Sequence, residues 1–206
     1  AIQASAHHRW GSDSLEGKAV AIQGAGNVGY HLAKELHRAG ARLFVTDMDA
    51  ERVKRVVNET GAHAVGTEEI YAQQADIFAP CALGAVINDR TIPQLRCEIV
   101  AGAANNQLLD DRHGDVLEER GILYAPDYVA NAGGVINVYS ELAGWSRERS
   151  LRKADEIYHT VLNVFDIAKQ DGLPTYKAAD RLAERRIAAV QAMVKTGPQW
   201  PNKADA

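Results

Sequence analysis

Residues 18–29, KAVAIQGAGNVG, decide the fold of this chain. Residues 18–23 form a short apolar run, which is typical of a buried parallel strand. Residues 24–29 complete a G-x-G-x-x-G pattern, and apolar side chains then recur at helical spacing from Val28 to Leu36. A strand, a glycine-rich turn and a helix in this order predict the first βαβ unit of a parallel sheet.

The alternation of short apolar runs and helical patterns continues outward from this stretch. We expect further strands at residues 42–46, 75–79, 98–101 and 122–124, and helices at residues 27–39 and 49–60, with Asp49 as an N-cap. From residue 131 the pattern changes to helices without strands, at 131–143, 147–170 and 175–195. The sequence therefore predicts an α/β fold: a Rossmann-type, doubly wound, mostly parallel sheet followed by C-terminal helices.

The two ends of the chain carry separate expectations. Residues 1–10, AIQASAHHRW, read as a helix already in progress and start without Met, so we expect a further portion to precede them. We expect residues 1–174 to form the nucleotide-binding domain and residues 175–206 to form a C-terminal helix and tail. Residues 197–201 should be irregular and residues 202–206 frayed.

The glycine pattern has a physical reading at each position. Gly24 permits a tight turn, Gly26 lets the backbone approach a pyrophosphate, and Gly29 allows the helix to pack closely on the strand. The free N–H groups and the dipole at the helix N-terminus favour the negative charge of that pyrophosphate. The candidate cofactor residues in this loop are Gly24, Ala25, Gly26, Asn27, Val28 and Gly29.

Asp47 follows the second predicted strand, where an acidic side chain hydrogen-bonds the adenosine ribose. Its charge would repel a 2′-phosphate, and residues 48–51 contain no Arg or Lys to offset it, so the expected cofactor is NAD rather than NADP. The alternative is a glycine-rich turn in a non-binding α/β protein, with Asp47 as a helix cap.

Composition excludes several classes of protein. The net charge is −4 with both signs interspersed, so no basic stripe for nucleic acid is visible, and no apolar run is long enough for a membrane span. The two cysteines have no metal-ligand spacing and the seven histidines form no H-x-x-x-H pattern, so we expect no metal site and a reducing, cytoplasmic setting.

Three later loops, which each follow a predicted strand, are rich in small residues and Asn. Together with the first unit, the stretches DIFAPCALGAVIN (76–88), AGAANNQL (101–108), YAPDYVANAGGVINV (124–138) and AADRLAERRI (178–187) resemble the Glu/Leu/Phe/Val dehydrogenases, and most closely their leucine branch. The resemblance implies oxidative deamination of an L-amino acid, leucine or a related branched-chain amino acid, with NAD⁺. It covers residues 12–190, and the fold it implies has two domains around a cleft, of which this chain resembles the second.

The resemblance also assigns roles to residues in these loops. Cys81 and Ala82 would pass over the nicotinamide ribose, and Asn131 belongs to an N-A-G-G turn near the nicotinamide, where glycine suits a positive φ. Asn106 would lie between the nicotinamide ribose and the substrate carboxylate, and Val138 would line the substrate side-chain pocket. A nucleophilic role for Cys81 is the weaker alternative, because no base is identifiable near it.

The chain departs from the family pattern in its lysines. The family holds an essential lysine and a carboxylate-binding lysine in a glycine-rich segment upstream, and no lysine here lies in such a segment. We therefore expect no catalytic residue in this chain, an inactive isolated chain, and an apolar face on residues 175–195 that packs on a preceding catalytic domain. The full-length enzyme is expected to be a homo-oligomer. A phenylalanine-, valine- or tryptophan-type enzyme and a non-catalytic NAD-binding module remain as alternatives.

Overall fold

A computed structural model describes residues 1–196 of the 206-residue chain, with side chains through residue 193. In this part of the chain six strands form one parallel sheet in the order β3-β2-β1-β4-β5-β6. The strands are β1 (Ala19–Gln23), β2 (Arg42–Thr46), β3 (His63–Ala64), β4 (Ile77–Pro80), β5 (Ile99–Val100) and β6 (Leu123–Tyr124). This is the strand order of the doubly wound Rossmann fold, which confirms the expected fold class.

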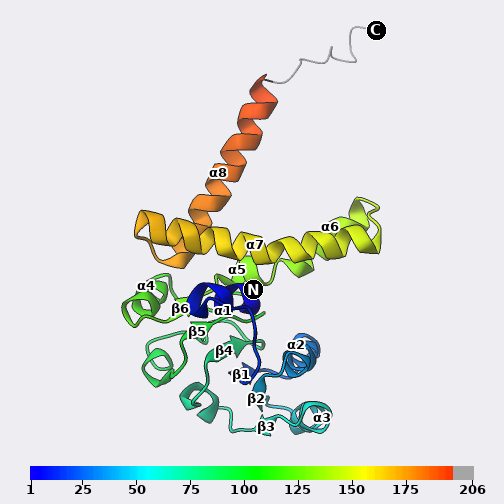
Figure 1. The fold of residues 1–206 in the computed structure, drawn as a ribbon, viewed down its shortest axis with the longest axis vertical. Helices are drawn as coiled ribbons and strands as arrows, with labels where there is room; N and C mark the ends of the chain where they lie inside the picture. Colours follow the sequence, from blue (N-terminus) through cyan, green and yellow to red (C-terminus); the bar gives the residue numbers. More distant parts are fainter. Residues whose placement is uncertain (197–206) are drawn as a thin grey trace.

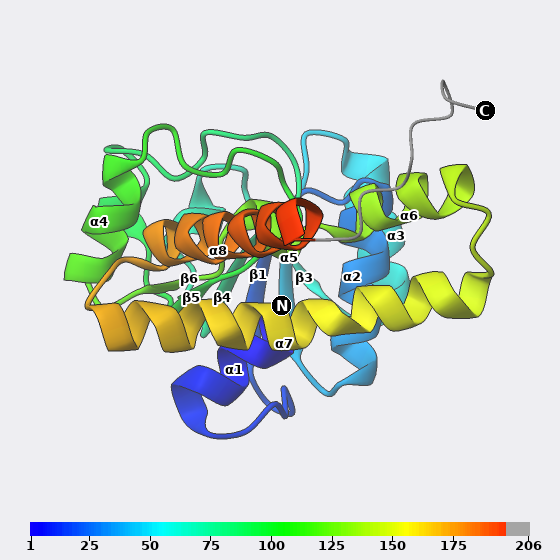
Figure 2. The ribbon, with the colours of Figure 1, turned by 90° about the horizontal axis from the view of Figure 1, so that it is seen from above.

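Helices cover the sheet on both sides and continue beyond it. They are α1 (Ile2–Trp10), α2 (Asn27–Arg38), α3 (Ala50–Thr60), α4 (Arg112–Glu119), α5 (Asp127–Ala130), α6 (Gly133–Leu142), α7 (Arg147–Asp171) and α8 (Thr175–Thr196), with short 3₁₀ turns η1 (Glu69–Ala72) and η2 (Ile92–Gln94). Figure 1 shows α7 lying across α1, while α8 projects away from the sheet. Figure 2, seen from above, shows α6 folding back beside the N-terminal end of the long helix α7.

Alternate residues of β1 divide the core into two layers. Val20 and Ile22 pack in one cluster with residues of α1, α2, α3 and α7, whereas Ala19 and Ala21 pack in the other with residues of η1 and α4. Because both faces of the sheet are buried, its central strands read in the sequence as continuous apolar runs rather than as alternating ones.

The structure differs from the expected elements at several positions. The two-residue strand β3 was missed because both of its side chains are exposed, and α4 was missed because most of its residues are polar. The helix expected at residues 131–143 is α6, which starts at Gly133, and it is preceded by a short helix, α5, that was not expected. Val28, expected on the buried face of α2, is 58% exposed. The expected tail from residue 197 lies outside the described residues.

The strand order reverses at β1, which has β2 on one side and β4 on the other. The connection after β1 runs through α2 on one face, and the connections after β4 and β5 run through η2 and α4 on the other face. The topological switch point therefore lies at the carboxyl ends of β1 and β4, which is the crevice where open α/β sheets bind their ligands.

Candidate dinucleotide-binding site

The turn after β1 is fixed by close contacts at two of its three glycines. Gly24 has a φ of +107°, and a Cβ added to it would lie 2.8 Å from the backbone nitrogen of Ala82. A Cβ on Gly29 would lie 1.9 Å from the carbonyl oxygen of Gly24. Neither position can hold a larger residue without a backbone shift, so the packing of the fold itself accounts for both glycines.

Gly26 has no such internal reason. Its backbone is ordinary for any residue (φ −64°, ψ −170°), and a Cβ there would meet no atom closer than Nη1 of Arg52 at 3.9 Å. Gly26 is also the N-cap of α2, which has no side-chain cap and no acidic residue in its first turn. The α2 N-terminus thus offers N–H groups beside an open space, as a bound pyrophosphate requires.

Asp47 lies at the end of β2 against this turn. Its Oδ2 accepts a hydrogen bond from the Ala25 nitrogen at 2.7 Å, and its Oδ1 accepts from the Asp49 nitrogen at 2.9 Å. Asp47 is half-buried, and each of its oxygens has lone-pair capacity beyond these bonds for ribose hydroxyls. The helix-cap reading of Asp47 is wrong, because Asp49 is the N-cap of α3 and accepts from the nitrogens of Glu51 and Arg52.

The expectation that no basic residue lies near Asp47 needs a correction. Residues 48–51 are indeed free of Arg and Lys. In the first turn of α3, however, Arg52 places its guanidinium beside Gly26, with Nη1 3.9 Å from a Cβ built there. Linear distance along the chain hid this approach, because Asp49 starts a helix that brings Arg52 back toward the turn.

The loops after β4, β5 and β6 interlock beside the glycine turn. A Cβ on Gly102 would lie 2.2 Å from the Pro80 oxygen, and the Ala104 nitrogen donates to that same oxygen at 2.9 Å. Nδ2 of Asn131 donates to Oδ1 of Asn105 at 2.6 Å, which joins the third loop to the second. The structure therefore brings the three loops together at one edge of the sheet, as their positions after parallel strands predict.

Asn106 has a left-handed backbone (φ +49°) and an exposed side chain. The side-chain carboxamide of Asn106 makes no hydrogen bond within the described residues, whereas the backbone carbonyl oxygen of Asn106 accepts from the Ala85 nitrogen at 2.6 Å. The Asn106 side chain therefore does not cap the turn after β5. A strained backbone with a free carboxamide at a crevice is typical of a ligand-binding residue.

Two residues that support this loop were missed in the sequence. The fully buried Gln107 donates through its backbone nitrogen to Oδ2 of Asp127 at 2.7 Å. Its Nε2 donates to the carbonyl oxygens of Gly102 and Ala104, each at 3.0 Å. The buried carboxylate of Asp127 thus connects two loops and fixes the backbone next to Asn106. The spacing of these residues in the sequence gave no sign of this contact.

Gly133 and Gly134 of the N-A-G-G turn do not have the positive φ that glycine would suit. Both lie in the first turn of α6 with ordinary helical backbone, and a Cβ at either would meet no atom within 4 Å. As at Gly26, neither the backbone conformation nor the packing at these two positions requires glycine. They follow Asn131, which is bonded to the Asn106 loop through Asn105.

Cys81 begins the loop after β4, and its environment argues against nucleophilic chemistry. Burial raises the pKa of its thiol to about 11, so the thiol is protonated at neutral pH. Its backbone nitrogen donates to the Gln23 oxygen at 2.7 Å, which ties the loop to the end of β1. Cys81 and the neighbouring exposed Ala82 thus form a wall of the crevice.

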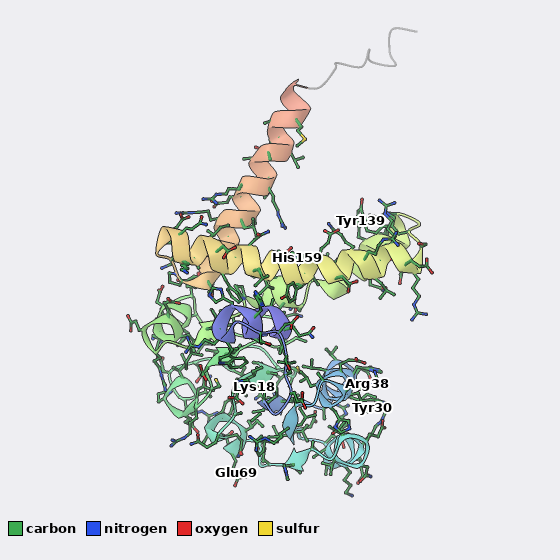
Figure 3. All side chains as sticks on the ribbon, viewed as in Figure 1. Lys18, Tyr30, Arg38, Glu69, Tyr139 and His159 are labelled. Atoms are coloured by element: carbon green, nitrogen blue, oxygen red, sulfur yellow. The ribbon has the colours of Figure 1, made fainter. Side chains whose placement is uncertain are left out.

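Apolar side chains are exposed on α6 and α8. Val138, expected in a substrate pocket, is 59% exposed on α6, and Figure 3 shows Tyr139 of the same helix lying well away from the sheet. The apolar face expected on residues 175–195 is confirmed through the described side chains, where Ile187 and Val190 are each more than half exposed.

Other kinds of site find little support. No group of three potential metal-binding side chains occurs among the described residues. Within residues 1–196 no helix is long and apolar enough to cross a bilayer. A hollow of about 470 Å³ lies between α1, α2 and the Ala101–Ala103 turn, but no residue of the glycine turn lines it.

Known proteins resemble this chain closely. The model of the Glutamate/Leucine/Phenylalanine/Valine dehydrogenase family matches residues 44–197, and the chain belongs to that family. Leucine dehydrogenase of Bacillus cereus is 58% identical over 190 residues, which are 92% of this chain and 52% of that protein. Leucine dehydrogenase of Geobacillus stearothermophilus is 59% identical over 186 residues, 90% of this chain and 51% of that protein.

A solved structure agrees with these relatives. The crystal structure of L-tryptophan dehydrogenase from Nostoc punctiforme superposes with a TM-score of 0.90 at 48% identity, over 93% of this chain and 57% of that one. The chain spans about half the length of the curated relatives it matches.

Proposed function

We propose that this chain is the NAD-binding domain of an L-amino-acid dehydrogenase that deaminates leucine or a related branched-chain amino acid to its 2-oxo acid, ammonium and NADH. The observation that carries the cofactor part is Gly26. It is a glycine without a conformational or packing reason, at an uncapped helix N-terminus, beside an acid at the end of β2. A pyrophosphate in contact with the turn supplies the missing reason.

The residues of the crevice divide the binding between them. The turn from Gly24 to Gly29 holds the pyrophosphate, and Asp47 accepts from the adenosine ribose. Cys81, Ala82 and Asn131 enclose the nicotinamide end, where NAD⁺ when bound supplies the hydride acceptor. Asn106 lies where its free carboxamide can reach both the nicotinamide ribose and the substrate carboxylate.

The preference for leucine is supported by degree of similarity. The leucine dehydrogenases are 56–59% identical to this chain, whereas L-tryptophan dehydrogenase of Nostoc punctiforme is 49% identical. Val138 adds an aliphatic side chain to the substrate pocket in this proposal. We assign the acid–base lysines, and the partner surface for Ile187 and Val190, to a preceding domain, in keeping with relatives of about twice this length.

The test is a substrate panel on the full-length protein. NAD⁺ reduction is followed at 340 nm with L-leucine, L-valine, L-phenylalanine and L-tryptophan, and kcat/KM is expected to be highest for L-leucine. The 206-residue chain alone should show no leucine-dependent reduction. A preference for an aromatic amino acid would move the substrate assignment. NADH binding without turnover of any amino acid would favour the non-catalytic module instead.

A further inference from the structure

Arg52 stands at the open side of the glycine turn, in a place that packing does not require. Its Nη1 is the nearest atom to a Cβ built on Gly26, at 3.9 Å, and its side chain is 57% exposed. A long cationic side chain on a surface helix is free to extend into water. This one instead lies over the crevice in which the proposed cofactor binds.

Asp49 directs the Arg52 side chain. Its Oδ2 pairs with Nε of Arg52 at 3.3 Å, while its Oδ1 accepts from the backbone nitrogens of Glu51 at 2.9 Å and Arg52 at 3.4 Å. Because Nε is engaged by Asp49, the terminal Nη groups of the guanidinium remain available as donors. An exposed pair of this kind adds little to folding stability, so stability alone is a weak reason for the arrangement.

Asp47 and Arg52 flank the same end of the turn. Asp47 is bonded to the Ala25 nitrogen and Arg52 lies against Gly26, the next residue. Met48, between the acid and its helix, is 92% exposed and uncharged. This end of the turn therefore carries one carboxylate, which accepts hydrogen bonds, and one guanidinium, which donates to anions.

A guanidinium binds phosphate through parallel N–H···O bonds, whereas a carboxylate repels it. We propose that Arg52 is a latent ligand for a 2′-phosphate on the adenosine ribose, and that the charge of Asp47 is what excludes NADPH from this site. The proposal rests on the proposed dinucleotide function of the crevice. If Arg52 is this ligand, removing the charge of Asp47 is enough to permit NADPH binding. In a site without a phosphate ligand, a new basic residue would also have to be added.

The test measures NADH and NADPH dissociation constants by fluorescence titration for four forms of the chain: wild type, Asp47→Ser, Arg52→Ala and the double variant. Wild type should prefer NADH. Asp47→Ser should strengthen NADPH binding by about tenfold or more, because a like-charge contact is removed. Adding Arg52→Ala should reverse that gain while changing NADH affinity by less than about threefold.

Two further variants keep the result interpretable. Lys54→Ala removes a cation on the same helix that pairs with Glu51 at 2.6 Å, and it should change neither affinity. Asp47→Asn keeps an acceptor for the Ala25 nitrogen, and it replaces Asp47→Ser if melting curves show that the serine variant does not fold.

The possible outcomes separate the proposals. If wild type binds neither nucleotide, the dinucleotide function fails and the inference with it. If wild type binds NADH but Arg52→Ala weakens NADH and NADPH equally in the Asp47→Ser background, Arg52 contacts a part common to both, and the latent phosphate site is overturned. If Arg52→Ala changes neither the NADH nor the NADPH affinity in that background, Arg52 only pairs with Asp49 and the latent phosphate site is likewise overturned.

Discussion

Gly26 and Gly29 belong to one motif, yet the structure gives alanine at each a different consequence. In Gly29→Ala the new Cβ would lie 1.9 Å from the Gly24 carbonyl oxygen, so the backbone must move by about 1 Å in a close-packed region. Such overpacking costs about 3 kcal/mol when the obstacle is backbone. Alanine returns about 1 kcal/mol of helix propensity. The net loss is about 2 kcal/mol, which lowers Tm by about 4–8 °C for a chain of this size.

In Gly26→Ala the fold has little to lose. The new Cβ meets only the end of the Arg52 side chain at 3.9 Å, and the backbone already suits alanine. A poorer N-cap and a less flexible unfolded chain offset each other to within about 1 kcal/mol. The Cβ occupies the space that we assign to the pyrophosphate. Losing one charge-assisted contact there weakens NADH binding by about tenfold to a hundredfold.

The assay is a melting curve and an NADH fluorescence titration on wild type and both variants. We expect Gly29→Ala to lose stability and Gly26→Ala to lose affinity while keeping its Tm. The reasoning is refuted if Gly26→Ala binds NADH as wild type does, or if its Tm falls as far as that of Gly29→Ala.

Three other predictions concern single side chains. In the full-length enzyme, Asn106→Ala should lower kcat by about 100-fold with little change in Tm or NADH affinity, whereas Asn105→Ala should lower Tm because its Oδ1 accepts from Asn131; unchanged turnover of Asn106→Ala would remove it from the site. Burial raises the pKa of Cys81 to about 11, so the contribution of the neutral thiol to folding stability is full below pH 9 and is lost as the pH rises through 11. Cys81→Ala should therefore lose less Tm than wild type over this range, and an equally steep loss would contradict the buried, neutral state of the thiol. Hydrogen bonds from Tyr30, which have the largest effect, and from Lys34 lower the pKa of Glu59 to about 2. The contribution of Glu59 to folding stability is therefore present above pH 4.5 and is lost as the pH falls through 2. The Tm difference between wild type and Glu59→Gln should shrink over that range, and a constant difference would show that the bonds do not depend on the charge.

Much of the fold can be predicted from local patterns in the sequence. The apolar run before Gly24, the spacing of the helix after it and the position of Asp47 predict a strand, a helix and an acid at one sheet edge, and the structure has all three. β3 is two exposed residues, so no periodicity marks it, and its pairing with β2 alone makes it a strand.

The rest of the site depends on contacts that spacing does not encode. Arg52 reaches Gly26 because a helix starts between Asp47 and Arg52, and Asp127 reaches the Gln107 nitrogen only through the folded sheet. Gly133 has no positive φ, so the conformational reason for a glycine does not apply there, and a close approach by a ligand is the other cause that glycine suits. A glycine can be interpreted only when its backbone and its surroundings are both known.

The central claim is that the crevice at the ends of β1 and β4 binds a nicotinamide dinucleotide. The most direct measurement is a calorimetric titration of NADH into the folded 206-residue chain. We expect saturable binding at one site per chain, which Gly26→Val abolishes without unfolding the protein. An absence of saturable heat with wild type, on a sample whose melting curve shows a folded chain, would contradict it.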